Sequence, residues 1–299
     1  MTGNYVDVLP HSRTQVLVLF HPSDPNPSGE PTPTSLVVEW EEGQPPRLED
    51  AKVVATRIVS CGIETLVMGR LGRVMVGRAG HWQEETIEGP QTHGFLCDAQ
   101  VVGQTVVAVG MDRQVYRRSE AGRWQSIHEG ILDQSLDVDV VTGFRSIDGG
   151  RSGDLYAVGL RGEIGWYHNG DWGLIEAPTN VILEQVRVSR NGRAMAVGQA
   201  GTILAGSGRT WRVVEQTATE ESFWGLEWFN GSFYLATQTG LFRFLDNDEL
   251  EPLDTGGPQN LTFCRLRATH DSLWSVGPSH LLRTSDGQEW LPIDLEAAT

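Results

Sequence analysis

The residues most able to hold a metal ion, histidine and cysteine, are scattered along this chain. The sequence has eight histidines and three cysteines among 299 residues. No two histidines have the close spacing that a zinc site uses. The cysteines Cys61, Cys97 and Cys264 lie in or just after apolar runs, where a small buried thiol fits, and they lack the paired spacing of a disulfide or metal site. We therefore predict neither a metal site nor a bound cofactor.

Patterns typical of nucleophilic catalysis and of phosphate binding are also missing. The nucleophile elbow Gly-x-Ser-x-Gly does not occur. The glycine-rich stretches at 159–163 and 198–202 are typical of hairpin turns between strands, whereas a phosphate cradle opens a helix. The sequence predicts a protein that is not an enzyme.

Residues 184–214 show which elements would position a functional side chain. Apolar runs of period two are separated there by Asn191-Gly192 and by further glycine-rich turns, which accept the positive φ of tight hairpins. The pattern predicts a four-stranded antiparallel meander. Its strands are expected at 186–188, 194–197, 203–205 and 211–214.

This meander recurs along the chain with a period near 40 residues. Aligned copies share a glycine after the second strand and a tryptophan 13 or 14 positions later, and four copies have a second glycine three positions after the place of the first, at Gly72, Gly162, Gly201 and Gly240. The first glycines are Gly69, Gly110, Gly159, Gly198 and Gly277, and Thr237 takes this place in one copy. The tryptophans are Trp82, Trp124, Trp172, Trp211 and Trp290, and Leu250 takes this place in the same copy. Such a period with four strands per copy indicates an all-β protein with a β-propeller fold.

The shared residues have physical roles in this interpretation. Small and β-branched residues on the second strand would pack between neighbouring blades. The paired glycines would turn the chain between the second and third strands. Each tryptophan would be a large apolar plate wedged against the adjacent blade, and so part of the core.

The number of blades depends on the N-terminal segment. Six copies cover roughly 57–295, and residues 4–50 hold four more candidate strands. A divergent first blade at 4–50 gives seven blades in a single domain over 1–299, and six blades with an N-terminal extension is the alternative. The loop at 21–34 contains five prolines, which keep it out of any ladder.

Two irregular segments remain. The interval of 49 residues between Gly110 and Gly159 is longer than the others, and we assign the extra length to a turn at 148–153. The last residues, 295–299, are expected to form a frayed tail.

The charge balance limits the partners of the protein. Its net charge is −16, from 39 acidic and 23 basic residues. Such an acidic chain is a poor ligand for nucleic acid, but it can attract a basic protein by electrostatic steering. No apolar run is long enough to cross a bilayer, and the first residues lack a secretory pattern. The sequence predicts a cytoplasmic protein that is a monomer by itself.

Three stretches of the repeat resemble a known family. AVGQAGTILAGSGRTW (196–211), AVGLRGEIGWYHNGDW (157–172) and SVGPSHLLRTSDGQEW (275–290) are similar to the repeat of the photosystem II stability and assembly factor propellers. They also resemble the wider BNR or Asp-box (sialidase-like) superfamily, and the segment Ser285–Trp290 is the nearest to its Asp-box, one residue short. In that superfamily the box is a structural hairpin. The assembly-factor resemblance implies binding to proteins, partly through arginines, and Arg70, Arg73 and Arg161 lie in the equivalent turns.

The sialidase-like resemblance also implies one enzymatic alternative. Sialidase chemistry needs an arginine triad, an acidic Asp and a tyrosine activated by a glutamate, all lining the central funnel. Tyr116 and Tyr167 fall on third strands, and Tyr156 and Tyr234 fall on second strands, away from the axis. Only Tyr5 is placed to reach the funnel, so the sequence disfavours a sialidase.

A partner-binding face is predicted where two sets of propeller loops meet. The loops from the fourth strand to the next blade, and from the second strand to the third, share one face of a propeller. Acidic side chains, arginines and aromatic residues are interleaved in these loops, a composition that suits a protein interface. The residues predicted for this face are Arg70, Arg73, Asp112, Arg113, Asp133, Asp137, Asp139, Arg161, Glu163, Glu220, Glu221, Phe223, Trp224 and His280.

Three functions follow from this interpretation, all carried by the surface. The main hypothesis is a non-enzymatic protein-binding propeller, in its sharper form an immunity protein that binds and neutralises a cognate bacterial toxin. The negative charge, the absence of an export signal and the absence of a catalytic motif favour it. The alternatives are an assembly or scaffolding factor for a larger complex and a carbohydrate-binding, sialidase-like module.

Overall fold

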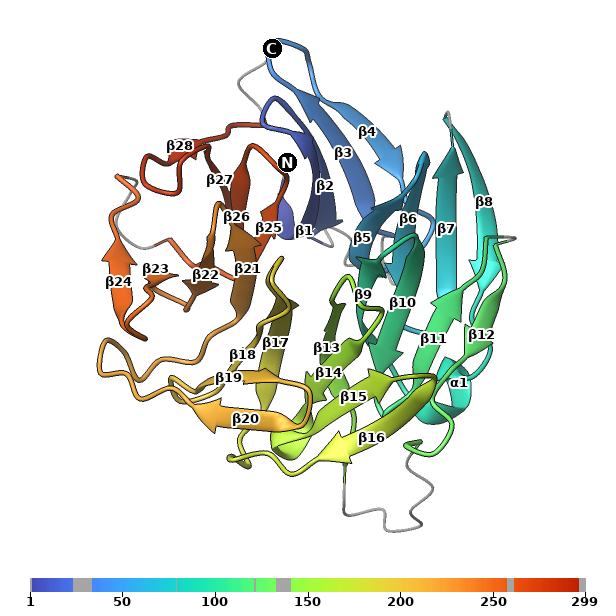
Figure 1. Cartoon of the computed structure of the whole chain (residues 1–299). Helices are drawn as coiled ribbons and strands as arrows, with labels where there is room; N and C mark the ends of the chain where they lie inside the picture. Colours follow the sequence, from blue (N-terminus) through green and yellow to red (C-terminus); the bar gives the residue numbers. More distant parts are fainter. Residues whose placement is uncertain are drawn as a thin grey trace.

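Seven four-stranded antiparallel sheets stand around a central axis in the computed structural model (Figure 1). The structure describes residues 2–23, 34–78, 80–120, 122–132, 141–256 and 261–295. In every sheet the four strands follow one another in chain order as a meander. The predicted seven-bladed β-propeller is therefore confirmed, and the alternative of six blades with an extension is wrong.

The strands of the first four blades match the apolar runs of the sequence. Blade 1 is formed by β1 (Gly3–Ser12), β2 (Gln15–Pro22), β3 (Leu36–Glu41) and β4 (Arg47–Asp50). Blade 2 is formed by β5 (Ala55–Cys61), β6 (Glu64–Gly69), β7 (Arg73–Arg78) and β8 (His81–Thr86). Blade 3 is formed by β9 (Leu96–Val102), β10 (Thr105–Gly110), β11 (Val115–Arg118) and β12 (Trp124–Ser126). Blade 4 is formed by β13 (Phe144–Gly149), β14 (Leu155–Gly159), β15 (Ile164–His168) and β16 (Asp171–Ile175).

The last three blades repeat the same plan. Blade 5 is formed by β17 (Leu183–Val188), β18 (Ala194–Gly198), β19 (Ile203–Ser207) and β20 (Thr210–Val213). Blade 6 is formed by β21 (Gly225–Phe229), β22 (Ser232–Ala236), β23 (Leu241–Phe244) and β24 (Leu250–Leu253). Blade 7 is formed by β25 (Arg265–Ala268), β26 (Leu273–Gly277), β27 (His280–Thr284) and β28 (Leu291–Pro292). A short helix, α1 (Pro90–His93), and a 3₁₀ turn, η1 (Leu160–Gly162), lie in connecting loops.

The hydrophobic core of the described residues is a ring of clusters between neighbouring blades. Leu19 of blade 1 and Val67 of blade 2 share one cluster, and Val276 of blade 7 and Val18 of blade 1 share another. Each buried aliphatic or aromatic side chain contributes about 1.5–3 kcal/mol. Because every blade buries both of its faces against neighbours, the ring as a whole is the folding unit.

The repeated tryptophans pack as the sequence predicts, against the preceding blade. Trp211 of blade 5 meets Tyr156 of blade 4 edge-on, with ring centroids 5.6 Å apart. The indole nitrogen of Trp124 in blade 3 donates to the Glu85 carboxylate of blade 2 at 2.9 Å. These side chains are structural.

The two repeated glycines have different roles, which corrects the prediction that both turn the chain. Gly198 has no positive φ, but a Cβ there would lie 2.1 Å from the carbonyl oxygen of Ile182, which precedes the inner strand of the same blade. Gly201 has a φ of 67° and lies beneath the carbonyl of Thr219 in the next connecting loop. The first glycine thus permits close approach of the inner strand, and the second makes the turn.

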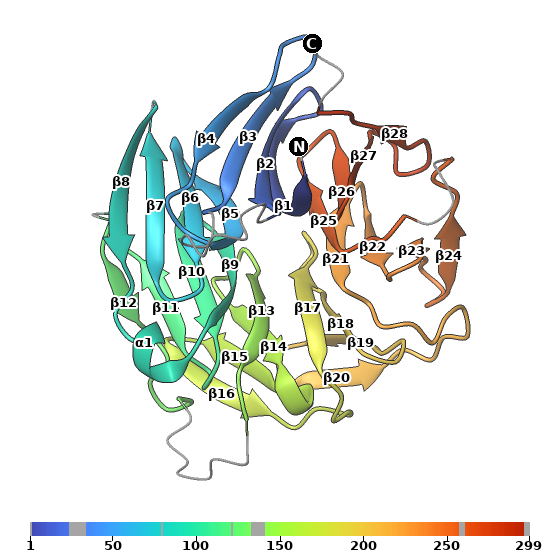
Figure 2. The same cartoon turned by 180° about the vertical axis from the view of Figure 1, so that it is seen from behind.

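The ring closes without a strand exchanged between the termini. The backbone nitrogen of Tyr5 donates to the carbonyl of Pro278 at 2.9 Å, and Trp40 meets Trp274 edge-on at 6.2 Å. The first and last blades are neighbours in both views (Figure 2). Leu295 is buried in the cluster between these blades, so the predicted frayed tail is wrong at its first residue. Residues 296–299 lie outside the described residues.

The extra length of the 49-residue interval is not where the sequence analysis placed it. The turn between β13 and β14 spans 150–154, the same length as the turn at 189–193 in the next blade. The additional residues belong to the connection between β12 and β13, at 127–143. The interval between the marker glycines spans both connections, so its length alone could not say which of them is longer.

Candidate functional site: an arginine-lined funnel on the loop face

The inner strands of five blades are bulged at the same level. The register of each is interrupted by one extra residue, which a β-bulge leaves unpaired. These residues are Val6, Thr56, Cys97, Arg145 and Glu184. Trp224 and Cys264 precede the inner strands of the remaining blades at the same level, and each bonds through its backbone nitrogen to the second strand.

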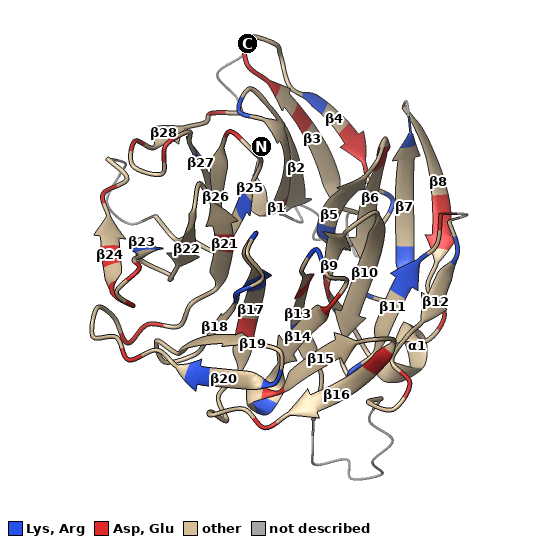
Figure 3. Cartoon of the chain, viewed as in Figure 1, with Lys and Arg blue, Asp and Glu red and all other residues tan. Residues whose placement is uncertain are grey.

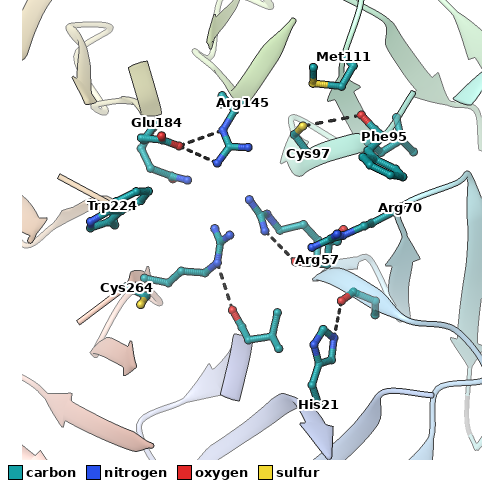
Figure 4. A pocket seen from close by; sticks show the side chains of 16 residues that line it. His21, Arg57, Arg70, Phe95, Cys97, Met111, Arg145, Glu184, Trp224 and Cys264 are labelled. Atoms are coloured by element: carbon teal, nitrogen blue, oxygen red, sulfur yellow. Dashed lines mark hydrogen bonds and ion pairs between the residues drawn. The ribbon is translucent and has the colours of Figure 1, made fainter. Parts of the chain in front are cut away.

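These seven residues form the wall of a cavity at the mouth of the central funnel. The cavity has a volume of about 430 Å³. Arg57, Gln185 and Arg265 line it from the inner strands just below, and loop residues including Arg70, Phe95 and Met111 line it from the rim (Figure 4). The loops that surround this mouth are the two sets predicted to form the partner-binding face, so the funnel lies at the centre of that face.

Four arginines make the funnel mouth basic although the protein is strongly acidic. Arg57, Arg70, Arg145 and Arg265 line the cavity, and Glu184 is the one carboxylate that the described part of the chain places in its wall. Arg145 binds Glu184 through Nε at 3.0 Å and through a terminal nitrogen at 2.9 Å. Figure 3 shows basic segments on the inner strands β5, β17 and β25 near the axis.

Two of these arginines have no carboxylate partner within the described part of the chain. The Nε of Arg265 donates to the carbonyl oxygen of Val6 at 3.2 Å, and no carboxylate of the described residues forms an ion pair with its terminal nitrogens. Arg70 lies over the ring of Phe95, 5.7 Å from the ring centroid. Burial, together with the charge of Arg57 and that of Arg267, lowers the pKa of Arg265 to about 9. The mouth is therefore a region of positive potential that could hold an anion.

A network of buried ion pairs closes the funnel below the mouth. The Nε of Arg57 donates to Asp98 at 2.6 Å, and Asp98 also accepts from the Ser146 hydroxyl at 2.8 Å. Burial alone would raise the pKa of Asp98, but Arg57 and two further arginines outweigh it and hold this pKa well below its usual range. One layer deeper, Arg267 binds Asp7 through two nitrogens at 3.0 and 3.1 Å. These pairs link inner strands of different blades and fix the floor of the cavity.

The structure brings some of the predicted face residues to the funnel and places others around it. Arg70 and Trp224 line the cavity, and Trp224 is 39% exposed. Arg113 and Glu163 form an ion pair of 2.6 Å that joins the loops of blades 3 and 4. Arg161 is exposed on the neighbouring turn.

Four more of the predicted residues are also on or near these loops. Asp112 lies 3.5 Å from the ring of His93. Glu220 is exposed, and Glu221 accepts from the hydroxyl of Thr239 at 2.6 Å. Arg73 instead points along its own sheet, where it binds Glu84 at 2.7 Å.

Two predicted face residues are turned inward. Phe223 is fully buried, and its apolar ring packs in the cluster between blades 5 and 6, whereas the next residue, Trp224, lines the cavity. His280 is also buried and packs edge-on against Phe263 at 5.0 Å, and burial lowers its pKa to about 4. We exclude both from the contact surface. Asp133, Asp137 and Asp139 lie outside the described residues.

Sequence reasoning missed the funnel arginines Arg57, Arg145 and Arg265. A usable signal was present, because each is a charged residue within the first three positions of an inner strand. The bulges could not be read from the sequence, and they decide which of two successive side chains enters the funnel.

Two features of the enzymatic alternatives, a metal-binding group and a tyrosine that lines the funnel cavity, are not found among the described residues. They contain no group of three or more His, Cys, Asp or Glu side chains that could hold a metal ion. Tyr5, the one tyrosine expected to reach the funnel, packs against Phe20 with ring centroids 5.6 Å apart and does not line the cavity. No helix among the described residues is long and apolar enough to cross a membrane.

Seven closed blades with an arginine-lined funnel at the loop face define the protein as a β-propeller with a central cavity. The solved structure of YCF48 from Cyanidioschyzon merolae has the same fold, with a TM-score of 0.72 and 12% identity over 94% of each chain. YCF48 bound to D1 peptide is also similar, with a TM-score of 0.68 and 14% identity over 93% of this chain and 90% of that chain. The predicted resemblance to the photosystem II assembly factor is thus confirmed for the fold.

The family follows from a closer sequence relative. No family model matches the chain. The chain is 31% identical over 271 residues to the immune protein Tsi7 of Pseudomonas aeruginosa, a match that covers 87% of this chain and 88% of Tsi7. The protein belongs to the family of immune protein Tsi7.

Proposed function

We propose that this protein is an immunity protein that binds a cognate bacterial toxin and neutralises it by binding rather than by catalysis. The observation that carries the proposal is the membership of the Tsi7 family, with 31% identity over most of both chains. The loop face supports it, because the exposed side chains of Phe95 and Arg70 meet there at the rim of a concave site. Aromatic and arginine side chains in such positions carry most of the energy of protein interfaces.

The proposed contact surface is centred on the funnel. Trp224 and Phe95, which are 39% and 50% exposed, would supply the apolar anchors. Arg70, which lies over the Phe95 ring, would add a charged contact to the partner beside them. Arg161 and Glu220 would form part of a polar rim. The three acidic residues at 133, 137 and 139 stay in the proposal as sequence predictions.

Net charge supports a basic toxin as the partner. A charge of −16 would accelerate the association of a basic protein and make the rate depend on salt. We further propose that the protein works in the cytoplasm as a monomer until it meets the toxin. A toxin that acts inside the cell would have to be met there.

Co-expression with the toxin encoded beside the gene tests the proposal. We expect the wild-type protein to restore growth and to co-purify with the toxin in a one-to-one complex, and Trp224→Ala to weaken binding at least tenfold. Ile63→Ala is the matched control, because Ile63 is 71% exposed on a turn of the opposite face. Absence of both rescue and complex would refute neutralisation, and co-purification with a multi-subunit assembly would favour a scaffolding factor instead.

We also propose that the last blade contains a relative of the Asp-box. The carboxylate of Asp286 accepts from the backbone nitrogens of Gln288 and Glu289 at 2.8 and 2.9 Å, and the hydroxyl of Thr284 donates to it at 2.9 Å. These bonds hold the hairpin between β27 and β28. An Asp286→Ala variant should therefore lose thermal stability while it keeps partner binding.

A further inference from the structure

The funnel mouth has the charge of an anion site in a protein of the opposite charge. Among the described residues, four guanidinium groups line the cavity and one carboxylate does. That carboxylate, Glu184, is already bound to Arg145 at 2.9 Å. Arg70 and Arg265 keep terminal nitrogens for another acceptor, since the described residues provide no carboxylate for either. The site is thus short of negative charge.

The floor of the cavity keeps these arginines in place. The Nε of Arg57 is bound to Asp98 and one of its terminal nitrogens donates to the carbonyl of Thr56 at 2.8 Å, so its guanidinium has a fixed orientation. The Nε of Arg265 is held by the carbonyl of Val6 in the neighbouring blade. In Figure 4 the guanidinium of Arg57 points into the cavity, toward the wall residues Trp224 and Arg145. Preorganised arginines lose little side-chain entropy when they bind a carboxylate.

The crowding of positive charge also favours an anionic occupant. Burial and the neighbouring Arg57 and Arg267 lower the pKa of Arg265 to about 9, which means that its cationic form is destabilised in the empty site. An anion between Arg57 and Arg265 would relieve this repulsion. Charge-assisted hydrogen bonds to a carboxylate are about twice as strong as neutral ones.

We propose that the funnel mouth is a carboxylate-binding site that receives an acidic side chain, or a C-terminal carboxylate, of a protein segment inserted from the partner. The source is a protein segment because apolar groups flank the charges: Trp224, Phe95 and Met111 line the same cavity. A free small anion would leave these groups exposed, whereas a peptide with an aromatic residue beside its carboxylate would cover them. The inference rests on the proposed function, since it assigns part of the toxin interface.

The cavity and the net charge then act at different ranges. The charge of −16 would attract a basic toxin from a distance. Within the interface, the basic funnel would accept only a segment with a correctly placed acid. A basic protein without that acid would leave Arg70 and Arg265 desolvated and unpaired, so the site would select among basic partners.

Binding of matched peptides tests the inference directly. The probes are acetyl-Ser-Glu-Phe-Asp-Ser-amide and its isosteric amide, acetyl-Ser-Gln-Phe-Asn-Ser-amide, measured by isothermal titration calorimetry at low salt. We expect the acidic peptide to bind at least tenfold more tightly than the amide peptide. Arg70→Glu should abolish this preference without unfolding the protein, because Arg70 is exposed, and Arg265→Gln should reduce it. Arg190→Glu, at an exposed position on the turn between β17 and β18 of the opposite face, should keep it.

Two results would overturn the inference. One is equal binding of the two peptides to the wild type. The other is Arg70-dependent binding of a free anion (citrate, N-acetylneuraminate or inorganic phosphate) that is tighter than binding of the acidic peptide, which would make the site one for small anions.

Measurements with the toxin separate this inference from the proposed function. If wild type and Arg70→Glu bind the toxin equally, the carboxylate site is refuted while neutralisation stands. If the acidic peptide binds through Arg70 and no toxin is bound or neutralised, the site stands and the proposed function fails.

Discussion

Replacing Asp98 by alanine should remove the anion on which the funnel floor depends. Its side chain is 1% exposed, and that of its ion-pair partner Arg57 is 5% exposed. The carboxylate accepts from Arg57 at 2.6 Å, from the Ser146 hydroxyl at 2.8 Å and from the backbone nitrogen of Ile147 at 3.3 Å. The substitution therefore leaves one buried cation and two buried donors without their acceptor.

The expected loss follows from the nature of this pair. Removing one partner of a buried ion pair costs about 3–5 kcal/mol, because the remaining charge is buried without compensation. Asp98→Ala should lie at the upper end of this range, since it also leaves the two donors unsatisfied. Asp98→Asn keeps the shape and one acceptor, and it should cost about 3 kcal/mol. Either loss is a large share of the roughly 5–15 kcal/mol that stabilises a domain.

Equilibrium urea unfolding, followed by far-ultraviolet circular dichroism, measures this loss. The midpoint should fall while the slope m stays constant, which identifies a change in stability. The double variant Arg57→Met with Asp98→Leu should recover more than half of the loss, because it removes both charges together. Arg47→Gln is the control, since the pair of Arg47 with Glu39 is exposed and worth no more than about 1 kcal/mol.

The pH dependence provides a second check of the same reasoning. The pKa of Asp98 is held well below its ordinary value of 3.8 in the folded state, so its stabilising effect is complete above that value. The difference between wild type and Asp98→Asn should be constant from pH 5 to pH 8 and should shrink as the pH falls below about 4. A loss of less than about 1 kcal/mol for Asp98→Ala would refute the claim that this pair holds the funnel floor.

Three further predictions concern single positions. Gly198→Ala should destabilise the protein by about 3 kcal/mol or more in urea unfolding, because a Cβ there would lie 2.1 Å from a backbone carbonyl oxygen. Gly192→Ala should cost only about 1 kcal/mol, because Gly192 has a φ of 84° but open space around it. Equal costs would contradict the close-approach argument. Phe223→Ala should cost about 3–5 kcal/mol and Trp224→Ala less than about 1, while only Trp224→Ala weakens partner binding in calorimetry at unchanged melting temperature; the reverse order would mean that Trp224, and not Phe223, belongs to the core. Burial raises the pKa of Asp148 to about 6, so the wild type loses stability as the pH rises and this carboxyl group ionises in the folded protein. The free energy of unfolding of Asp148→Asn should therefore rise above that of the wild type by up to about 3 kcal/mol between pH 4 and 6 and stay above it at pH 8. A difference that does not change with pH would reject this origin.

Much of the fold could be predicted because it repeats. The glycine and tryptophan markers recur near 40 residues, and such a repeat can bury its faces only by stacking copies around an axis. The first blade lacks both markers, yet its four apolar runs have strand length and period, and they became β1 to β4. The net charge and the scarcity of spaced histidine and cysteine are also sequence properties, and they pointed toward a surface function.

Only the tertiary structure decided which side chains meet at the axis. A single extra residue in an inner strand moves a side chain from one face of the sheet to the other, and bulges at Arg145 and Glu184 place these charges in the funnel. In blade 6, whose inner strand is not bulged, Trp224 lines the cavity and the adjacent Phe223 joins the core. Sequence spacing carries the period of the blades. The pairing of Arg57 with Asp98 and the basic mouth of an acidic protein arise from contacts between side chains of different blades.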